Sequence, residues 1–219
     1  METIKRNIAV AQRGYAVDVP SACPICHRHN QFNQGAINLI NDQSKVQVTF
    51  QCTYQHCAQQ FFCYYGPVGS ADLERVVPSM PSPYQFSDDV KRVSPRFIDT
   101  FAQAEQAYVN GLKEICGPGY RKAFEFLIKD YAISTKPGDV ENIKKAFSGE
   151  VVNSYIDDKR VQTVAKRTLW LGNDETHYLK RWVDKDIDDL IQLIKLTAHW
   201  IDIEYGSKKY LDEMPDNTA

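Results

Sequence analysis

The sequence predicts a mainly α-helical protein in which a helical bundle follows a small β domain. Two patterns support this fold class. Between residues 17 and 65 the chain carries few charges and alternates with the two-residue period of short strands, as in residues 45–50 and 60–65. After residue 94, apolar residues recur with the 3.6-residue period of helices. We therefore expect an N-terminal segment with the β domain (1–76), a proline-rich linker (77–94) and a helical bundle (95–219).

Length and composition exclude several classes of protein. A chain of 219 residues that is 43% hydrophobic and 25% charged is typical of a globular protein, not of a disordered or collagen-like one. The formal net charge of -2 gives no large positive field, so any binding of a polyanion must be local. No apolar run approaches the about 18 residues of a membrane span, and residues 1–20 lack the apolar stretch of a signal peptide. We expect a cytoplasmic protein with no membrane contact.

The strongest chemical signal in the β domain is a set of four cysteines. Cys23 and Cys26 form one close pair, and Cys52 and Cys57 form a second pair after 25 intervening residues. Two cysteine pairs on turns joined by a strand hairpin provide the tetrahedral thiolate set of a zinc ribbon. Because four protein ligands leave no open coordination position, the spacing predicts one structural Zn²⁺ per chain rather than a catalytic ion.

Nearby residues leave some alternatives open. Three histidines lie close to the cysteines in sequence, and one could replace a thiolate: His27, His29 and His56. Cys63 falls in an alternating aromatic strand, where a small buried side chain explains it without ligation. Zinc ribbons often bind nucleic acid, but residues 17–65 hold only Arg28 and Lys45 as basic residues, which fits a protein contact at least as well.

The helical part begins at a clear start signal. Ser94 is a helix N-cap residue and Pro95 suits the first helical position, and the first helix is expected to stop at 117–119, a Gly-Pro-Gly sequence. Further apolar stripes predict helices around 120–131, 140–147 and 161–172, the last ending at Gly172, and a long final helix from Asp184 to Gly206. On that final helix Trp200 and Ile203 lie off the main apolar stripe, which predicts contact with a partner or a second copy.

The order of elements resembles a known family. After the proline-rich segment come FIDTFAQAEQAYVNG, YRKAFEFLIKDY, LGNDETH and a final amphipathic helix. This order resembles the bacterial domain-of-unknown-function family 4145, whose members often carry a CPxC zinc knuckle in front. That family is grouped with the HEPN superfamily of helical, commonly dimeric domains from antiviral defence, toxin and restriction systems. The resemblance covers about residues 17–205 and implies a HEPN-like bundle and a homodimer.

The resemblance also implies a candidate catalytic pair. Active HEPN ribonucleases cleave RNA without metal by means of an arginine and a histidine, separated by four to six residues and paired across a dimer. His177 matches the histidine, but the arginine would fall at residues 170–172, where no residue is basic, and the nearest candidate is Arg167. We therefore expect a non-catalytic or accessory interaction module of a defence, toxin or restriction system, with a protein partner. The alternative is a dimeric, metal-independent endoribonuclease with His177 and Arg167 at its site; RNA or DNA is kept as a second class of partner.

Three further features have competing explanations. If Asn173 caps a helical turn, His177 lies near a helix N-terminus and suits a general base; otherwise its ring pins the loop. Arg121 and Glu125 match the family's R-x-x-x-E and are spaced as an intrahelical salt bridge. An acidic run is interpreted as a solvated, capped helix face rather than a metal cluster: Asp184, Asp186, Asp188 and Asp189.

Overall fold

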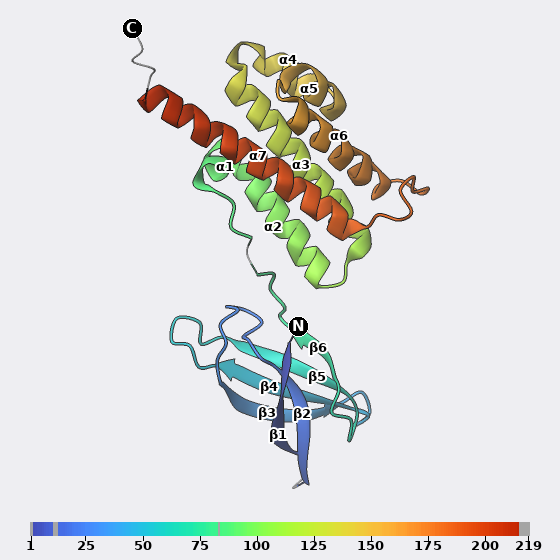
Figure 1. Cartoon of the computed structure of the whole chain (residues 1–219). Coiled ribbons are helices and arrows are strands. Elements are labelled where there is room, and N and C mark those ends of the chain that lie inside the picture. The colour runs from blue at the N-terminus through green and yellow to red at the C-terminus, as the bar shows by residue number, and fades with distance from the viewer. Residues whose placement is uncertain (1, 11–12, 83, 215–219) are drawn as a thin grey trace. The chain divides into compact units, whose positions relative to one another are not determined.

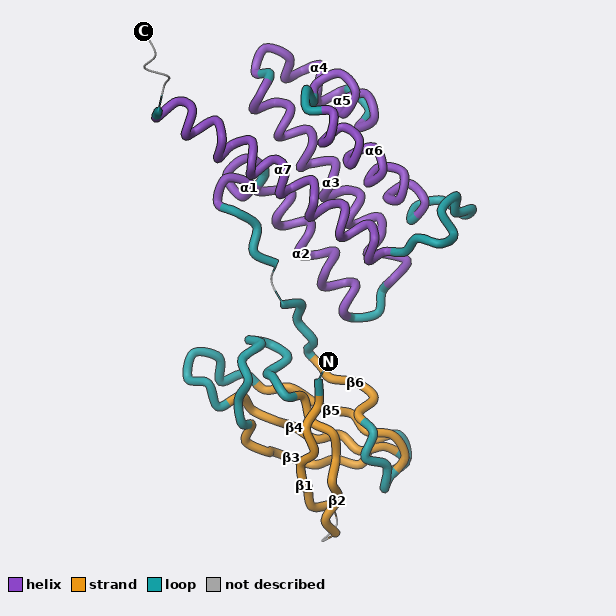
Figure 2. The backbone as a smooth tube through the Cα atoms, viewed as in Figure 1, coloured by secondary structure: helices purple, strands orange, loops and turns teal. Residues whose placement is uncertain are grey.

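The computed structural model describes residues 2–10, 13–82 and 84–214 and divides the chain into two compact units, Met1–Ser82 and Pro83–Ala219. All described strands lie in the first unit and all described helices in the second (Figure 2). The described residues are 50% helical and 22% strand, with two antiparallel sheets. The prediction of a mainly α protein is therefore wrong, and the fold is α+β.

The first unit contains two antiparallel sheets (Figure 1). One is the pair β1-β2 and the other is the four-stranded sheet β3-β4-β5-β6, in that order. The strands are β1 (Thr3–Val10), β2 (Arg13–Pro20), β3 (Phe32–Ile40), β4 (Lys45–Cys52), β5 (Gln60–Pro67) and β6 (Leu73–Val77). The alternation in residues 45–50 and 60–65 predicted β4 and β5 correctly, and both strands bury every second side chain.

A single core joins the two sheets of the first unit. Phe32, Phe50 and Phe61 pack ring against ring, with the Phe32 and Phe61 centroids 5.0 Å apart. The buried Tyr65 hydroxyl donates a 2.9 Å hydrogen bond to the Asp18 carbonyl of β2, which ties the β1-β2 pair to the larger sheet. The error in fold class arises because four strands carry many polar residues and acquire their strand conformation by pairing: β1, β2, β3 and β6.

The second unit is a bundle of helices. They are α1 (Asp88–Val93), α2 (Pro95–Val109), α3 (Lys113–Thr135), α4 (Val140–Lys145), α5 (Ser148–Tyr155), α6 (Lys159–Asp174) and α7 (Ile187–Glu213), with a 3-10 turn at Pro137–Asp139. The longer helices α2, α3, α6 and α7 lie side by side (Figure 1). The stripe predicted for residues 120–131 lies within α3, where it is buried in the core. The short α1 falls in the segment expected to be a linker.

The Gly-Pro-Gly sequence at 117–119, which was predicted to end the first helix, does not end it. α2 ends earlier than predicted, before Gly111, whose φ of 76° is the left-handed conformation that terminates helices. The Gly-Pro-Gly sequence lies inside α3 instead. A Cβ on Gly119 would lie 3.1 Å from the Ala104 Cβ, and one on Gly117 would lie 2.6 Å from the Glu175 Cβ. These glycines therefore allow close packing.

The start of α2 is as predicted, since Pro95 is its first residue and Ser94 its N-cap. The Ser94 hydroxyl does not cap the helix but donates a 2.5 Å hydrogen bond to Asp130 on α3. α6 continues through Gly172 to Asp174, so the predicted end at Gly172 is wrong.

The predicted limits of the last helix are also wrong. α7 begins after Asp186, whose carboxylate forms a capping box with Asp189, and not after Asp184. It also continues past Gly206 to Glu213. None of the helices in the described part of the chain combines the length and apolar content that a bilayer span requires.

Candidate metal centre

The four paired cysteines lie on two backbone turns of similar construction. In the first, the His27 N–H donates to the Cys23 carbonyl and the Cys23 N–H donates to the Arg28 carbonyl, both at 2.9 Å. In the second, the Ala58 N–H donates to the Tyr54 carbonyl at 2.9 Å. His27 and Ala58, which directly follow the second cysteine of each pair, both have positive φ, 59° and 47°. Each turn therefore reverses sharply just after a cysteine.

The longer spacing of the second pair has a simple explanation. Tyr54 has the backbone role in the second turn that Cys23 has in the first, because each accepts the hydrogen bond from the residue four positions on. Cys52 lies two residues before Tyr54, at the end of β4, and its N–H donates to the Gln59 carbonyl at 3.0 Å. The last residue of a strand thus supplies the ligand that a shorter pair would carry on the turn itself.

The four sulfur atoms converge at one point. The Sγ atoms of Cys23 and Cys57 are 4.0 Å apart, those of Cys26 and Cys52 are 3.8 Å apart, and all four lie within 4.8 Å of one another. A tetrahedral ion with metal–sulfur bonds of about 2.3 Å requires sulfur–sulfur distances of about 3.8 Å. A disulfide would bring two sulfurs to about 2.05 Å. The prediction that these four cysteines come together is confirmed, and their sulfur atoms are positioned to bind a metal ion.

The donor set fits a borderline-soft cation such as Zn²⁺. Without a cation, burial raises the pKa of the Cys23 thiol to about 12 and also raises that of Cys57. Burial also acts on Cys26, but the Arg28 backbone N–H and the neighbouring thiols lower its pKa below the ordinary value. Binding a metal ion to this cluster therefore displaces protons from buried thiols. The residues present fit a metal closed on all four sides by protein.

Several neighbours support the cysteines, and the sequence did not point to them. The Ile25 N–H donates to Cys23 Sγ at 3.5 Å, and Asn30 Nδ2 donates to Cys52 Sγ at 3.7 Å. The Arg28 guanidinium lies 4.3 Å from the Tyr54 ring centroid, so a cation–π contact links the two turns. Such groups around a metal site orient its ligands. Asn30 and Cys52 are 22 residues apart in sequence, and only the folded chain brings them together.

The other candidate ligands lie outside the cluster. Among the described residues, the histidines expected as substitutes are not members of the four-residue group. Cys63 is fully buried in the strand core, as expected, and burial raises its pKa to about 12. Cys116 is buried in α3 of the other unit.

The two basic residues of this region are both engaged. Arg28 stacks on Tyr54, and Lys45 forms a 2.5 Å ion pair with Glu74. Phosphate contacts require clustered and accessible cations. Within residues 17–65 these two side chains do not form such a cluster, because each is engaged separately.

Within one chain, the candidate catalytic residues Arg167 and His177 do not line the same described cavity. Arg167 lies on α6, where its guanidinium donates to the Thr163 carbonyl at 2.9 Å and lies 6.0 Å from the Trp170 ring centroid. The cavity that Arg167 lines does not include His177 among its lining residues. His177 is exposed in the loop after α6, and among the described residues it forms no hydrogen bond or ion pair that would pin the loop. Asn173 lies within the last turn of α6 and does not cap a helical start, so the alternative that places His177 near a helix N-terminus does not apply.

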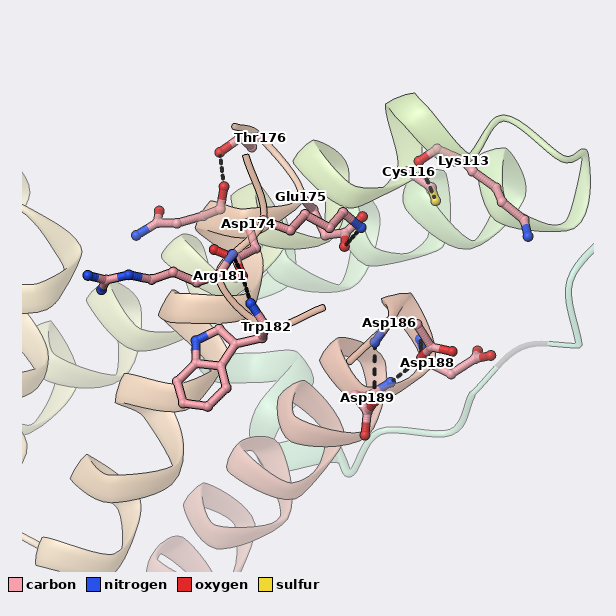
Figure 3. Close-up of polar contacts among 12 residues, drawn as sticks. Lys113, Cys116, Asp174, Glu175, Thr176, Arg181, Trp182, Asp186, Asp188 and Asp189 are labelled. Atoms are coloured by element: carbon pink, nitrogen blue, oxygen red, sulfur yellow. Dashed lines mark hydrogen bonds and ion pairs between the residues drawn. The ribbon is translucent and has the colours of Figure 1, made fainter. Parts of the chain in front are cut away.

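The segment before His177 has a structural task instead. One carboxylate oxygen of the buried Asp174 accepts the backbone N–H groups of Arg181 and Trp182, both at 2.8 Å (Figure 3). Trp182 stacks on Trp170 of α6, with ring centroids 6.1 Å apart and an interplanar angle of 10°. Asp174 and this aromatic pair fold the α6–α7 loop back onto the end of α6.

The Arg121–Glu125 ion pair expected on α3 does not form. Glu125 pairs with Lys129 at 3.1 Å and with Lys122 at 3.7 Å, both on the same helix. Arg121 Nε donates instead to the Asn173 side-chain oxygen at 2.8 Å. In the acidic run, Asp186 and Asp189 cap α7 and Asp188 accepts the Tyr108 hydroxyl, so these carboxylates serve helix capping and packing.

Comparison with protein-family models, with curated proteins and with solved structures gives no match.

Proposed function

We propose that the four cysteines hold one structural Zn²⁺ and that the chain is a non-catalytic, accessory interaction module. The single observation that carries this proposal is the closed cluster of four thiols, because a metal bound by all four keeps no position for water or substrate. The β unit around it is small, and a structural zinc contributes directly to the folding of small domains.

The family resemblance supplies the biological context of this proposal. The order of elements is consistent with a HEPN-like domain of family 4145: a proline-rich segment, two adjacent helices, the 171–177 segment and a long last helix. The six cysteines form no disulfide, which is consistent with a reducing, cytoplasmic compartment. We propose an accessory role in a bacterial defence, toxin or restriction system. Metal-independent RNA cleavage by a dimer is the rival, and it requires Arg167 and His177 to meet across two copies.

The interaction surface that fits this proposal best is the outer face of α7. Its last turns extend past the rest of the helical unit (Figure 1). Leu196, Ile203 and Tyr210 follow one another at seven-residue intervals and are 43%, 56% and 64% exposed, and Met214 continues the same face with 72% exposed. Trp200, expected to be an interface residue with Ile203, instead packs against the core and under Arg160, at 4.5 Å.

This face is self-complementary, which favours a second copy of the chain as its partner. In an antiparallel pair of α7 helices centred between Gly206 and Ser207, Ile203 of one copy faces Tyr210 of the other. The two small residues allow close approach at the centre, and a Cβ on Gly206 would meet nothing within 4 Å. Asp202 of each copy then lies near Lys209 of the other, so opposite charges flank the apolar stripe.

Elemental analysis of the purified full chain tests the metal centre. We expect about one zinc per chain, lost in Cys52→Ser, together with loss of the β structure but not of helical circular dichroism. Cys63→Ala is the matched control, because it removes a buried thiol of the same unit outside the cluster, and it should keep the zinc. Zinc-free protein from a fresh preparation, or equal zinc loss in both variants, would sink the structural-zinc proposal.

Light scattering across a range of concentrations tests the α7 interface. We expect a dimer that Ile203→Glu converts to a monomer, because a carboxylate replaces the apolar contact at the centre of the interface. Ile115→Glu is the matched control, since Ile115 is 63% exposed on α3 and is not part of the proposed α7 interface. A monomeric wild-type chain, or a dimer that Ile203→Glu leaves intact, contradicts this assignment.

A further inference from the structure

The helical unit contains a large basic cleft that the metal centre and the α7 face do not explain. It has a volume of about 820 Å³ and lies between α3, the start of α5 and α6. Glu125 is the one carboxylate among its lining residues. Four basic side chains also line it: Arg121, Lys129, Lys145 and Lys166. In a chain with a net charge of -2, this is a strong local concentration of positive charge.

Most of these cations are not neutralised within the protein. Glu125 pairs with Lys129 at 3.1 Å and so compensates one of the four. Within the described part of the chain, Arg121, Lys145 and Lys166 form no ion pair with a carboxylate. Bringing like charges together in a partly enclosed space is unfavourable unless an anion binds there. The cleft therefore has a surplus of positive charge that an anionic ligand would balance.

Arg121 is held in an orientation that suits binding of an anion in the cleft. Its Nε donates to the Asn173 side-chain oxygen at 2.8 Å, which leaves the two terminal guanidinium nitrogens to face other partners. A Cβ on Gly172 would lie 3.1 Å from the Arg121 Cγ, so the glycine lets the arginine stem lie against α6. A guanidinium held in one orientation suits bidentate recognition of a phosphate group.

The first turn of α5 adds further donors. Phe147, Ser148 and Gly149 line the cleft, and Phe147, at the N-cap position, gives the helix no side-chain cap. The N–H groups of Glu150 and Val151 bond to the Phe147 carbonyl, so the earlier N–H groups of Ser148 and Gly149 are the ones not used by the helix. Uncapped N–H groups at a helix start attract anions, and here they meet the basic side chains.

Two aromatic side chains border the same cleft. Phe147 is 86% exposed and Trp170 is 43% exposed, and both line it. The sequence predicted that Phe147 belongs to an apolar helical stripe, but it follows α4 and lies open to solvent. An exposed aromatic beside a cluster of cations provides an apolar surface for the organic part of an anion. The volume is in the range of sites for small organic ligands.

We propose that this cleft binds a small organic phosphate, with the phosphate group between Arg121, Lys166 and the start of α5 and its apolar body against Phe147. The site belongs to the helical unit alone, so its test does not depend on the zinc or on the oligomeric state. A phosphate dianion would offset most of the uncompensated charge. The aromatic border favours an ester over free phosphate.

Calorimetric titration of the full chain with phenyl phosphate and with inorganic phosphate tests the proposal. We expect saturable binding of phenyl phosphate that is tighter than that of inorganic phosphate. Lys166→Ala should weaken phenyl phosphate binding by about tenfold or more, because a charged hydrogen-bond donor is lost. Phe147→Ala should bring the affinity for phenyl phosphate close to that for inorganic phosphate.

Gly149→Asp separates loss of binding from loss of fold. A Cβ at Gly149 meets nothing within 4 Å, and an acidic residue in the first turn of a helix is favourable, so the midpoint of thermal unfolding should not fall. The added carboxylate should nevertheless reduce phenyl phosphate binding by about tenfold or more. Lys208→Ala, an equal loss of charge on α7, is the control and should change the affinity by less than about twofold.

The proposal is overturned if phenyl phosphate shows no saturable binding up to about 10 mM, which corresponds to a binding free energy of only about -3 kcal/mol. It is equally overturned if Gly149→Asp binds as the wild type does, or if Lys208→Ala weakens binding as much as Lys166→Ala. Equal affinities for phenyl phosphate and inorganic phosphate, unchanged by Phe147→Ala, would contradict the assignment of an organic ligand.

Discussion

Replacing Asp174 tests whether the segment before His177 is a structural clasp. The side chain is 7% exposed, and its Oδ2 accepts two backbone N–H groups of the α6–α7 loop at 2.8 Å. Hydrogen bonds to a charged acceptor contribute about 1.5–3 kcal/mol each. The two N–H groups lie in an exposed loop and would regain water, so the lower end applies, and Asp174→Ala should cost about 3 kcal/mol. Asp174→Asn keeps one oxygen acceptor without the charge and should cost about 1 kcal/mol.

Tryptophan fluorescence during urea unfolding is the right assay for this prediction. All three tryptophans, at positions 170, 182 and 200, belong to the second unit, so the signal is specific to the helical bundle. Trp182 stacks on Trp170 and should lose this contact when the loop opens. Asp184→Ala is the matched control, because Asp184 is an exposed carboxylate of the same loop. A cost for Asp174→Ala within about 0.5 kcal/mol of that control would refute the reasoning.

Three other outcomes follow from the same structure. The purified protein should leave single-stranded RNA intact in EDTA; cleavage that both His177→Ala and Arg167→Ala abolish in folded protein would favour the ribonuclease. Hydrogen bonds from the Arg160 side chain and backbone lower the pKa of Asp158, the N-cap of α6, to about 2. Its stabilising effect is complete above the ordinary value of 3.8 and is lost as the pH falls through about 2, so acid titration between these values should destabilise the wild type more than Asp158→Asn. Gly172→Ala should displace Arg121 and so weaken phenyl phosphate binding. The free energy of unfolding should change little, because alanine adds about 1 kcal/mol of helix propensity that offsets the steric contact. Unchanged binding would show that Arg121 has room to adjust.

The metal cluster was predictable because its chemistry is local in sequence. Each cysteine pair is placed by one short turn, and β4 and β5 between and beyond the pairs show the alternation of strands. The larger second spacing made the pair look irregular only because Cys52 is on the strand end and not on the turn. The supporting contacts of Asn30 and Arg28 cross between turns, and no spacing rule in the sequence marks them.

The fold class was missed because several strands owe their conformation to pairing. β3 buries Phe32 but has mostly exposed or half-buried residues along the rest of its length, so its sequence does not alternate. β1 pairs with β2 along its whole length, although Lys5 and Arg6 interrupt its apolar positions. Composition and periodicity detect burial, and these strands are defined by backbone hydrogen bonds instead.

The errors at the glycines and at the Arg121 motif have one cause. Glycine was interpreted through its backbone freedom, as a place where a helix ends, whereas Gly119 and Gly172 lie inside helices. At both positions the missing side chain makes room for a neighbouring helix, Ala104 in one case and the Arg121 stem in the other. Arg121 and Asn173 are 52 residues apart, and they meet only because Gly172 admits the arginine against α6. Two short patterns that seemed to be an ion pair and a loop cap are thus parts of one wall of the basic cleft.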